Sequence, residues 1–235
     1  MQPYAITHQG NERERNEDRY FIKQLSKNTV LLAVADGMGG EVAGELASGI
    51  AADTFSTFKL ENADPIKALH MAFEATHLKI VETAAKNPNL SGMGTTLVAV
   101  VVLDQRAFWA SCGDSRLYLF RQGQLHQITK DHNMPGMLLS AGEITKDQAF
   151  KHPMSNMLMR SLGGKKWQPD TGDFPVAPQD ILLLSSDGLH GELSHFEIQR
   201  ILMSGQNLES RCDDLLKAVL DAGGLDNITI IGVEL

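Results

Sequence analysis

A run of apolar residues ends in a carboxylate in the stretch Val30-Leu31-Leu32-Ala33-Val34-Ala35-Asp36-Gly37, and the pattern recurs in Ile181-Leu182-Leu183-Leu184-Ser185-Ser186-Asp187-Gly188. A third acidic residue, Asp226, stands just before the apolar run Ile228–Ile231. Short apolar runs of this kind are typical of buried strands. A carboxylate at the mouth of a buried strand is costly unless a positive group meets it. The three segments therefore predict buried strands and a cation site together.

The remaining sequence predicts strands and helices that are partly segregated along the chain. Residues from about Tyr20 to Ala35 have the pattern of two strands, and two helices with apolar faces follow, the second beginning at Asp64-Pro65. The later expected elements are strands at Thr95–Leu103, Ala107–Cys112, Leu117–Phe120, Leu125–Ile128 and Ile181–Leu184, helices near Ser194–Met203 and Leu208–Leu220, and a last strand at Ile228–Leu235. This order predicts an α+β fold with two sheets stacked between helix layers.

Composition and charge narrow the class of protein. The 235 residues contain 43% apolar and 21% charged residues, which is ordinary for a globular chain, and we read them as one domain over 1–235. The net charge of −8 argues against broad nucleic-acid binding or attachment to an anionic membrane, because both need a basic face. The sequence therefore predicts a protein that binds neither nucleic acid nor membrane.

The cysteines and the first residues indicate a cytoplasmic protein. Cys112 and Cys212 form no CxxC pair, so we expect buried thiols and neither a zinc site nor a disulfide framework. The start of the chain, Met1–Ala5, shows no basic segment followed by an apolar stretch, so no signal peptide is expected. The apolar stretch Leu97–Leu103 is far too short to span a bilayer.

Acidic residues beside turns or strand ends form the candidate site. They are Glu17, Asp18, Asp36, Asp114, Asp187 and Asp226. A single Asp-Gly is better explained as a turn, but the set as a whole is not, since turn acids do not usually follow such apolar runs. If the strand ends share one rim, the carboxylates converge, and two charges about 4 Å apart repel by about 4 kcal/mol at an effective dielectric of about 20.

Oxygen ligands with few histidines select Mg²⁺ or Mn²⁺ over Zn²⁺. Two such ions about 3.5–4 Å apart can bridge a water and lower its pKa, and the resulting hydroxide suits in-line attack on phosphorus. A nearby arginine would hold the phosphate oxygens in bidentate fashion. Arg13 and Arg15 are the nearest candidates in the sequence.

Six motifs in order now point to a family. They are Arg13-x-x-Asn16-Glu17-Asp18, Asp36-Gly37-Met38-Gly39-Gly40, Gly94-Thr95-Thr96, Gly113-Asp114-Ser115-Arg116, Ser186-Asp187-Gly188-Leu189 and Asp226-Asn227-Ile228-Thr229. Together they resemble the metal-dependent serine/threonine protein phosphatases of the 2C type, in their compact bacterial form. The resemblance covers about residues 4–234. Each motif alone is weak, but the ordered set is specific.

The resemblance implies a fold and a ligand set. The fold would be a four-layer αββα sandwich of two antiparallel sheets flanked by helix pairs, with two Mg²⁺ or Mn²⁺ ions at one end. Asp36 would bridge both ions and Gly37 would lend its carbonyl. The other ligands would be Asp187 and Asp226 on one ion, and Glu17 or Asp18 on the other, directly or through water. Asp114 with Asp187 resembles the family's weaker third-metal site.

The resemblance also implies the activity. The protein would hydrolyse phosphoserine and phosphothreonine on proteins and oppose a Ser/Thr kinase, with Asp36 and Asp187 in the catalytic centre and Arg13 as the phosphate clamp; Arg15 falls at the wrong spacing. The irregular region at about 131–164 would be the flap beside the active site. Met38 stands where some eukaryotic members carry a histidine, so the leaving-group proton would come from a metal-bound water or another group.

Two further expectations complete the interpretation. A compact acidic domain of this size is compatible with a monomer. The alternative function is a catalytically silent module of the same fold that binds phosphoproteins, but such a module should have lost metal ligands, and none of the expected ones is missing.

Overall fold

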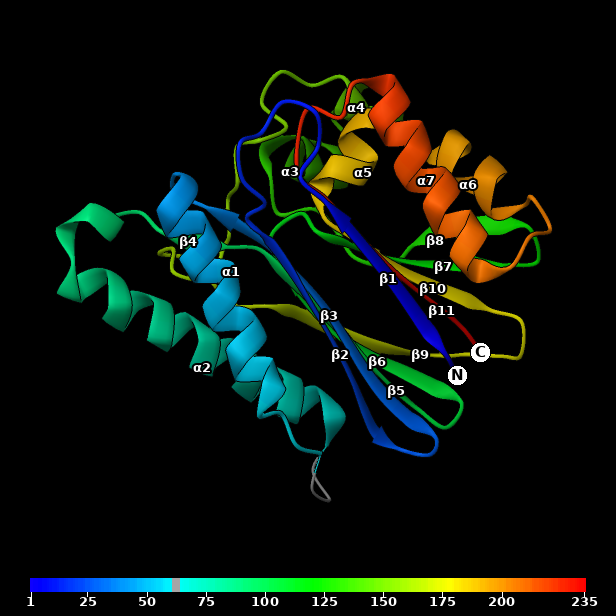
Figure 1. The fold of residues 1–235 in the computed structure, drawn as a ribbon, viewed down its shortest axis with the longest axis horizontal. Helices are drawn as coiled ribbons and strands as arrows, with labels where there is room; N and C mark the ends of the chain where they lie inside the picture. The colour runs from blue at the N-terminus through cyan, green and yellow to red at the C-terminus, as the bar shows by residue number, and fades with distance from the viewer. Residues whose placement is uncertain (61–63) are drawn as a thin grey trace.

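The computed structural model describes residues 1–60 and 64–235, and its strands form two antiparallel sheets that pack face to face (Figure 1). The first sheet contains, in spatial order, β1 (Pro3–His8), β11 (Ile228–Glu234), β10 (Ile181–Ser185), β7 (Arg116–Arg121) and β8 (Gln124–Gln127). The second contains β2 (Asp18–Ser26), β3 (Thr29–Met38), β5 (Leu97–Leu103), β6 (Arg106–Cys112) and β9 (Asp170–Pro175), and the short β4 (Gly94–Thr95) pairs with β3.

Helices cover the outer face of each sheet. The second sheet packs against α1 (Glu41–Ser56) and α2 (Pro65–Lys86), which the short 3₁₀ turn η1 (Pro88–Leu90) follows. The first sheet packs against α5 (Asp187–Glu192), α6 (His195–Leu202) and α7 (Leu208–Ala222). Two further short helices, α3 (Met134–Ser140) and α4 (Lys146–Phe150), lie in the region 131–164. The predicted four-layer αββα sandwich of the α+β class is confirmed.

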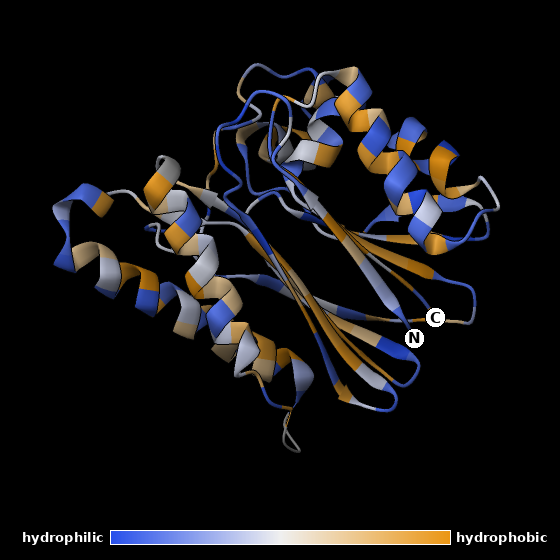
Figure 2. Cartoon of the chain, in the orientation of Figure 1, coloured by the Kyte–Doolittle hydropathy of each residue, from blue (hydrophilic) through white to orange (hydrophobic). Residues whose placement is uncertain are grey.

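The apolar runs are continuous because both faces of each central strand are buried. In β3, Leu31, Ala33 and Ala35 face the helices. The alternating Val30, Leu32 and Val34 face the other sheet. Successive side chains of a strand point to opposite faces, so a strand between two apolar layers has no polar face to show. Figure 2 shows these central strands as the most hydrophobic part of the molecule.

The strands that sequence reasoning missed lie at sheet edges. Strand β1 pairs only with β11, and β9 pairs only with β6. Residues of β9 alternate between half-buried and exposed, and its sequence Asp-Thr-Gly-Asp-Phe-Pro has no apolar run. An edge strand packs one side only, so its sequence carries a weaker apolar signal.

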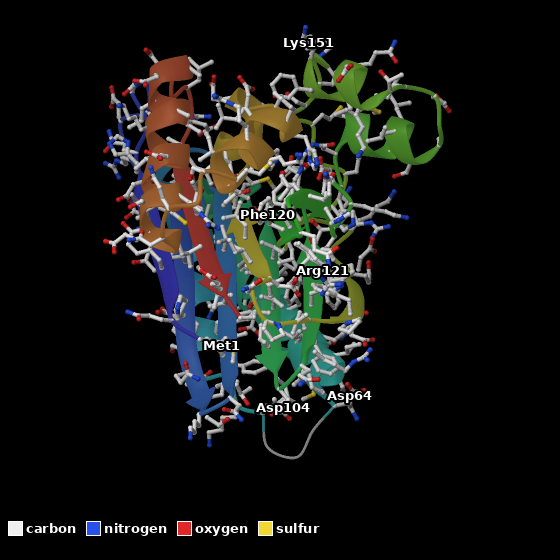
Figure 3. The ribbon with its side chains drawn as sticks, turned by 90° about the vertical axis from the view of Figure 1, so that its right-hand side faces the viewer. Met1, Asp64, Asp104, Phe120, Arg121 and Lys151 are labelled. Atoms are coloured by element: carbon white, nitrogen blue, oxygen red, sulfur yellow. The ribbon has the colours of Figure 1, made fainter. Side chains whose placement is uncertain are left out.

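The candidate site lies at one end of the sandwich. Because β10 and β11 are antiparallel neighbours, the residue that follows β10 and the residue that precedes β11 lie at the same end. Asp187 follows β10 and Asp226 precedes β11, and the register places Ser185 opposite Ile230. Figure 3 shows the region 131–164, to which we give the name flap and which carries Lys151, at the end of the molecule opposite the β5–β6 turn at Asp104. None of the described helices is long and apolar enough to cross a membrane.

Candidate metal centre and active site

The acidic residues of three different strand ends line one cavity of about 290 Å³. Asp36 comes from the end of β3, Asp187 opens α5 directly after β10, and Asp226 lies in the loop before β11. The cavity also contains the other expected groups, namely Arg13, Glu17, Gly37 and Asp114. Residues that are up to 213 positions apart in the chain therefore meet at one end of the sandwich.

Asp18 lies beside this cavity, in the protein interior. Its side chain is only 2% exposed, and its Oδ2 accepts a hydrogen bond of 2.7 Å from the Ser186 hydroxyl. Its Oδ1 is buried and has no hydrogen-bond partner in the part of the chain that the structure describes. Because a buried carboxylate oxygen is costly without a partner, this atom fits a bound water or cation nearby.

The carboxylates raise each other's pKa. Burial, followed by the negative charges of Asp187, Asp18, Asp114 and Asp226, raises the pKa of Asp36 well above its ordinary range. Burial and the charge of Asp226 raise the pKa of Asp187 to about 6. Burial and the charge of Asp187 raise the pKa of Asp114 to about 8. Burial raises the pKa of Asp18 to about 7, although the Ser186 hydrogen bond opposes the shift. This repulsion is what bound cations would relieve.

The donor set fits hard divalent ions. The cavity contains carboxylates and backbone oxygens without histidine or cysteine, which favours Mg²⁺ or Mn²⁺. Within residues 1–60 and 64–235, no group of three or more His, Cys, Asp or Glu side chains is arranged to hold an ion by itself. Mg²⁺ usually keeps several waters and takes only one or two carboxylates, so this open arrangement suits it.

Arg13 is the cation that faces the acidic cavity. Its guanidinium nitrogen lies 2.7 Å from Asp226 Oδ2, and about half of its side chain is exposed. Burial lowers the pKa of Arg13, but Asp226, Asp187 and Glu17 outweigh that effect and raise it above its usual value. The guanidinium is therefore charged, near the carboxylates and accessible to a ligand.

Arg15, the other arginine considered from the sequence, has a different place. Its guanidinium lies 3.9 Å from Glu45 of α1, and Arg15 is not among the residues that line the cavity. Arg13 alone of the two faces the carboxylates.

Gly37 and Gly44 allow the acidic segments to approach closely. A Cβ at Gly37 would overlap the carbonyl oxygen of Gly44 in α1, and a Cβ at Gly44 would overlap the Glu17 carboxylate. Glycine is needed where backbone approaches another group this closely. The two glycines therefore allow the segments that carry Glu17 and Asp36 to lie beside each other.

Two threonines that the motif analysis named without a role fix the backbone of Asp36. Thr96 Oγ1 accepts a 3.2 Å hydrogen bond from the Asp36 amide, and Thr95 Oγ1 donates to the Asp36 carbonyl over 2.8 Å. Both threonines are almost fully buried. They orient the carboxylate by holding its main chain, and only the fold reveals this, because the residues are about 60 positions apart.

Asn227 fixes the loop that carries Arg13 and Glu17. Its Nδ2 donates to the carbonyls of Gln9 and Arg15, both at 2.8 Å, and its Oδ1 accepts from the Glu17 amide at 2.8 Å. The motif Asp226-Asn227 was the only signal in the sequence, and it named Asn227 without a role. The structure shows that this side chain ties the N-terminal loop to the start of β11.

The first residues of the flap are hydrogen-bonded to the loop that carries Asp114. His132 Nδ1 accepts a hydrogen bond from the Gly113 amide at 3.1 Å, and its Nε2 lies 3.1 Å from Asp170. Asn133 donates to Asp114 Oδ2 over 2.9 Å. Burial raises the pKa of Asp170, but its hydrogen bonds from His132 and Arg160 bring it below the ordinary value. The start of the flap therefore contacts the loop that presents Asp114.

Comparison with known proteins gives a consistent result. The family model described as "Protein phosphatase 2C" matches residues 7–222. A serine/threonine phosphatase stp of Listeria monocytogenes is 38% identical, and the match covers 97% of this chain and 93% of the relative. A protein phosphatase PhpP of Streptococcus pneumoniae is 34% identical and is matched over 100% of this chain and 98% of its own length.

Solved structures agree. The Mycobacterium tuberculosis serine/threonine phosphatase PstP/Ppp superposes with a TM-score of 0.91 at 33% identity, covering 100% of this chain and 98% of that one. The catalytic domain of PstP in complex with two manganese ions gives a TM-score of 0.89 at 32% identity, with 99% and 97% covered. The chain belongs to the protein phosphatase 2C family of metal-dependent serine/threonine protein phosphatases.

Proposed function

We propose that the protein hydrolyses phosphoserine and phosphothreonine on other proteins, with two Mg²⁺ or Mn²⁺ ions in the cavity around Asp36. The observation that carries this proposal is the meeting of Asp36, Asp187 and Asp226 with Arg13 in one cavity of about 290 Å³. Mutually repelling carboxylates beside one accessible guanidinium suit two cations and a phosphoryl group between them.

The ligand roles that we propose are those that the resemblance to the family implies for these positions. Asp36, whose pKa is raised by four other carboxylates, would bridge both ions, and the carbonyl of Gly37 would contribute a further oxygen. Asp187 and Asp226 would complete one ion, and Glu17 would serve the other. Asp18, which is buried behind the cavity, would act through water. Asp114 with Asp187 would form a third, weaker site.

When bound, two divalent ions would lower the pKa of a shared water and so supply the nucleophile. Arg13 would hold the phosphoryl oxygens through its forked guanidinium, exchanging part of its contact with Asp226 for the substrate. Met38 lines the cavity but carries no exchangeable proton, so the proton for the departing serine or threonine oxygen comes from water or from another group.

The chemistry of the proposed substrate also indicates which class of enzyme must produce it. Phosphoserine and phosphothreonine on proteins are made by protein kinases, so we propose a Ser/Thr kinase as the enzyme that this phosphatase opposes. We further propose a monomer that works in the cytoplasm, where two buried free thiols such as Cys112 and Cys212 would stay reduced.

The alternative function, a catalytically silent phosphoprotein-binding module, has no observation in its favour. All six acidic residues expected at the metal centre are present, and five of them line the cavity. A silent module has no need to keep carboxylates that repel one another.

Phosphate release from a phosphothreonine peptide tests the proposal. We expect release with Mn²⁺, none after chelation by EDTA, and a loss of about a hundredfold or more in Asp187→Asn. The matched control is Asp221→Asn, an exposed aspartate of α7 outside the cavity, which should keep wild-type activity. Binding of the peptide in saturating Mn²⁺ without turnover would instead support the silent module.

A further inference from the structure

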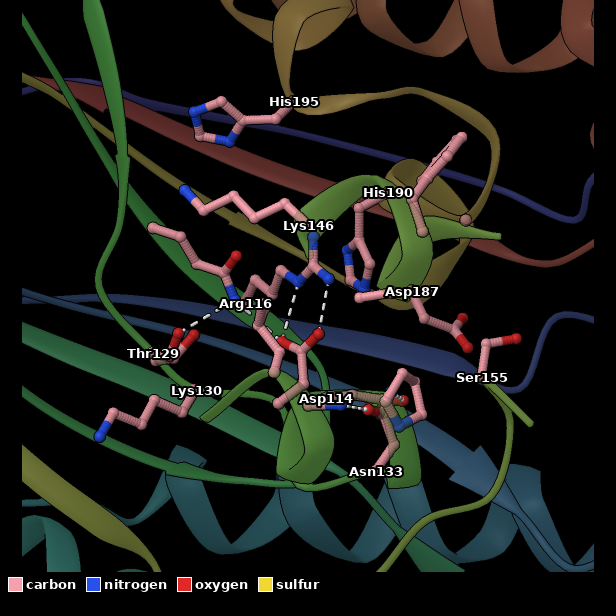
Figure 4. A pocket seen from close by; sticks show the side chains of 18 of the residues that line it. Asp114, Arg116, Thr129, Lys130, Asn133, Lys146, Ser155, Asp187, His190 and His195 are labelled. Atoms are coloured by element: carbon pink, nitrogen blue, oxygen red, sulfur yellow. Dashed lines mark hydrogen bonds and ion pairs between the residues drawn. The ribbon is translucent and has the colours of Figure 1, made fainter. Parts of the chain in front are cut away.

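A second cavity, of about 330 Å³, lies between the flap and the helices α5 and α6 (Figure 4). Asp114, Asn156 and Asp187 line both this cavity and the catalytic one, so the two are adjoining. The metal centre leaves this space unused. We call it the flap pocket.

His190 points to a ligand in the flap pocket. The residue is only 8% exposed, and its Nδ1 is buried without a hydrogen-bond partner in residues 1–60 and 64–235. Figure 4 shows its ring among the pocket-lining side chains, near Asp187 and Lys146. Burial and the nearby Arg116 charge lower the pKa of His190 well below its ordinary value, so the ring is neutral. A neutral imidazole has one donor and one acceptor nitrogen, and either can make a hydrogen bond with a polar group of a peptide backbone.

Charged side chains of both signs line the flap pocket. Lys130 and Lys146 are exposed and line it, and the described residues provide neither of them with an ion pair. The guanidinium of Arg116 is neutralised by Asp131, with contacts of 2.9 and 2.5 Å. Asp147 also lines the pocket, and Asp114 and Asp187 line it where it adjoins the catalytic cavity, so Lys130 and Lys146 are the lining cations that have no ion pair among the described residues.

Apolar side chains from both sides also line the flap pocket. Leu139 and Phe150 come from the flap, and Leu193 comes from the end of α5. Phe150 is 39% exposed, so part of its ring is available for contact. Apolar side chains, two lysines without ion pairs and an imidazole with an unused nitrogen suit an extended segment of polypeptide that carries an apolar and an acidic side chain.

We propose that the flap pocket binds the substrate chain next to its phosphorylated residue, with an apolar side chain on Phe150 and Leu139 and an acidic side chain at Lys130 and Lys146. This inference rests on the proposed phosphatase function, because the phosphoryl group in the adjoining cavity sets which part of the substrate reaches the pocket. His190 holds a peptide group of that segment. The pocket thereby selects substrates by the residues beside the phosphorylation site.

Four phosphothreonine peptides test the proposal with the full chain and Mn²⁺. Each carries a phenylalanine and either a glutamate or a lysine, placed on the N-terminal or the C-terminal side of the phosphothreonine. We expect a higher kcat/KM for the glutamate peptide on one side, by about fivefold, the size of an exposed ion pair. The double variant Lys130→Glu/Lys146→Glu should reverse the preference. Lys217→Glu/Lys67→Glu, the same double substitution at exposed lysines of α7 and α2 outside the pocket, should keep it.

His190→Ala tests the peptide contact separately. We expect KM for the preferred peptide to rise several-fold, more than KM for p-nitrophenyl phosphate, and His190→Asn to recover part of the loss, because an amide keeps a donor and an acceptor. Thermal melting of each variant shows that it is folded.

Equal hydrolysis of all four peptides by the wild type, or a preference that survives the double lysine variant, would overturn the inference. Absence of Mn²⁺-dependent hydrolysis of every substrate, p-nitrophenyl phosphate included, would instead overturn the proposed function. The two failures are therefore distinguishable in one set of assays.

Discussion

The rim of the metal centre and the flap are built in opposite ways. At the rim, Asp36, Asp187 and Asp226 sit at the ends of central strands, and buried Thr96, Ser186 and Asn227 bind the adjacent backbone or carboxylates. In the flap, large apolar side chains are exposed, namely Met137, Phe150, Met154 and Met157. One region is held in place from inside the protein, and the other presents side chains to solvent.

The difference between the two regions suggests which of them carries out catalysis and which recognises the substrate. Ions and a reacting phosphorus need groups held to within a fraction of an ångström, which buried hydrogen bonds provide. Recognition of varied protein segments needs adaptable surface, which short helices and methionines provide. Predictions that damage one region and spare the other test this division.

The largest effect is expected from Asn227→Ala, which removes three hydrogen bonds that hold the Arg13–Glu17 loop. We expect kcat/KM to fall by about 10- to 100-fold, as when partners of metal ligands are removed. The free energy of unfolding should fall by about 1–2 kcal/mol, because three partly buried backbone groups lose their partner. Phosphatase kinetics and chemical denaturation measure the two effects.

Asn207→Ala is the matched control. Asn207 caps α7 by accepting from the Ser210 amide at 2.8 Å, so its loss should cost about 1 kcal/mol of stability and leave kcat/KM unchanged. If both asparagine variants lost activity in proportion to stability, the rim would not depend on Asn227 for its geometry.

A smaller effect is expected from His132→Ala, which cuts the link between the flap base and the Gly113 amide. We expect faster tryptic cleavage at the flap lysines and a loss of about 1–3 kcal/mol in the free energy of unfolding, because the Gly113 amide and Asp170 lose a partner. His152→Ala, whose ring accepts only from the nearby Met154 amide, is the control. Unchanged cleavage in His132→Ala would mean that the flap does not need this link.

The smallest effect is a gain in stability. Asp114→Asn removes a buried carboxylate whose pKa is raised to about 8, mainly by burial and by Asp187. A raised pKa in the folded state means that wild-type stability is lost as the pH climbs from the unfolded value of about 3.9 toward about 8. In EDTA, the variant should therefore melt above the wild type, by about 2–4 °C near pH 8 and by less near pH 5.

Asp147→Asn, in the exposed first turn of α4, is the control and should show no such pH-dependent gain. A melting temperature of Asp114→Asn that stays at or below that of the wild type from pH 5 to 8 in EDTA would mean that Asp114 is not under electrostatic strain. Calorimetry across this pH range makes the measurement.

Much of the central sandwich could be predicted from local patterns. The runs in β3, β5, β10 and β11 are apolar on both faces, and the cap at Asp64-Pro65 correctly marks the start of α2. Strands β1 and β9 were missed because they are edge strands whose sequences mix polar and apolar residues. The six residues of α5 were missed because a helix that short offers too little periodicity to detect.

The candidate site was predicted as a set of residues, not as an arrangement. That Asp36, Asp114, Asp187 and Asp226 share a cavity was inferred from strand ends, and the structure brings them together. That Asp18 is buried beside Ser186, and that Asn133 donates to Asp114, depends on segments that only tertiary packing brings together. His190 gave no signal at all, because a histidine that lacks a partner is visible only when its neighbours are known.

The pairing of β1 with β11 sets a time at which the enzyme can become active. Pro3 lies opposite Val233, and Arg13 binds Asp226, so segments that are translated 213 residues apart build the same site. A nascent chain that stops short of Asp226 lacks both the partner strand of β1 and one of the carboxylates of the site. Catalysis therefore requires that Asp226 and β11 have been translated, and a nascent chain without them should not dephosphorylate a substrate.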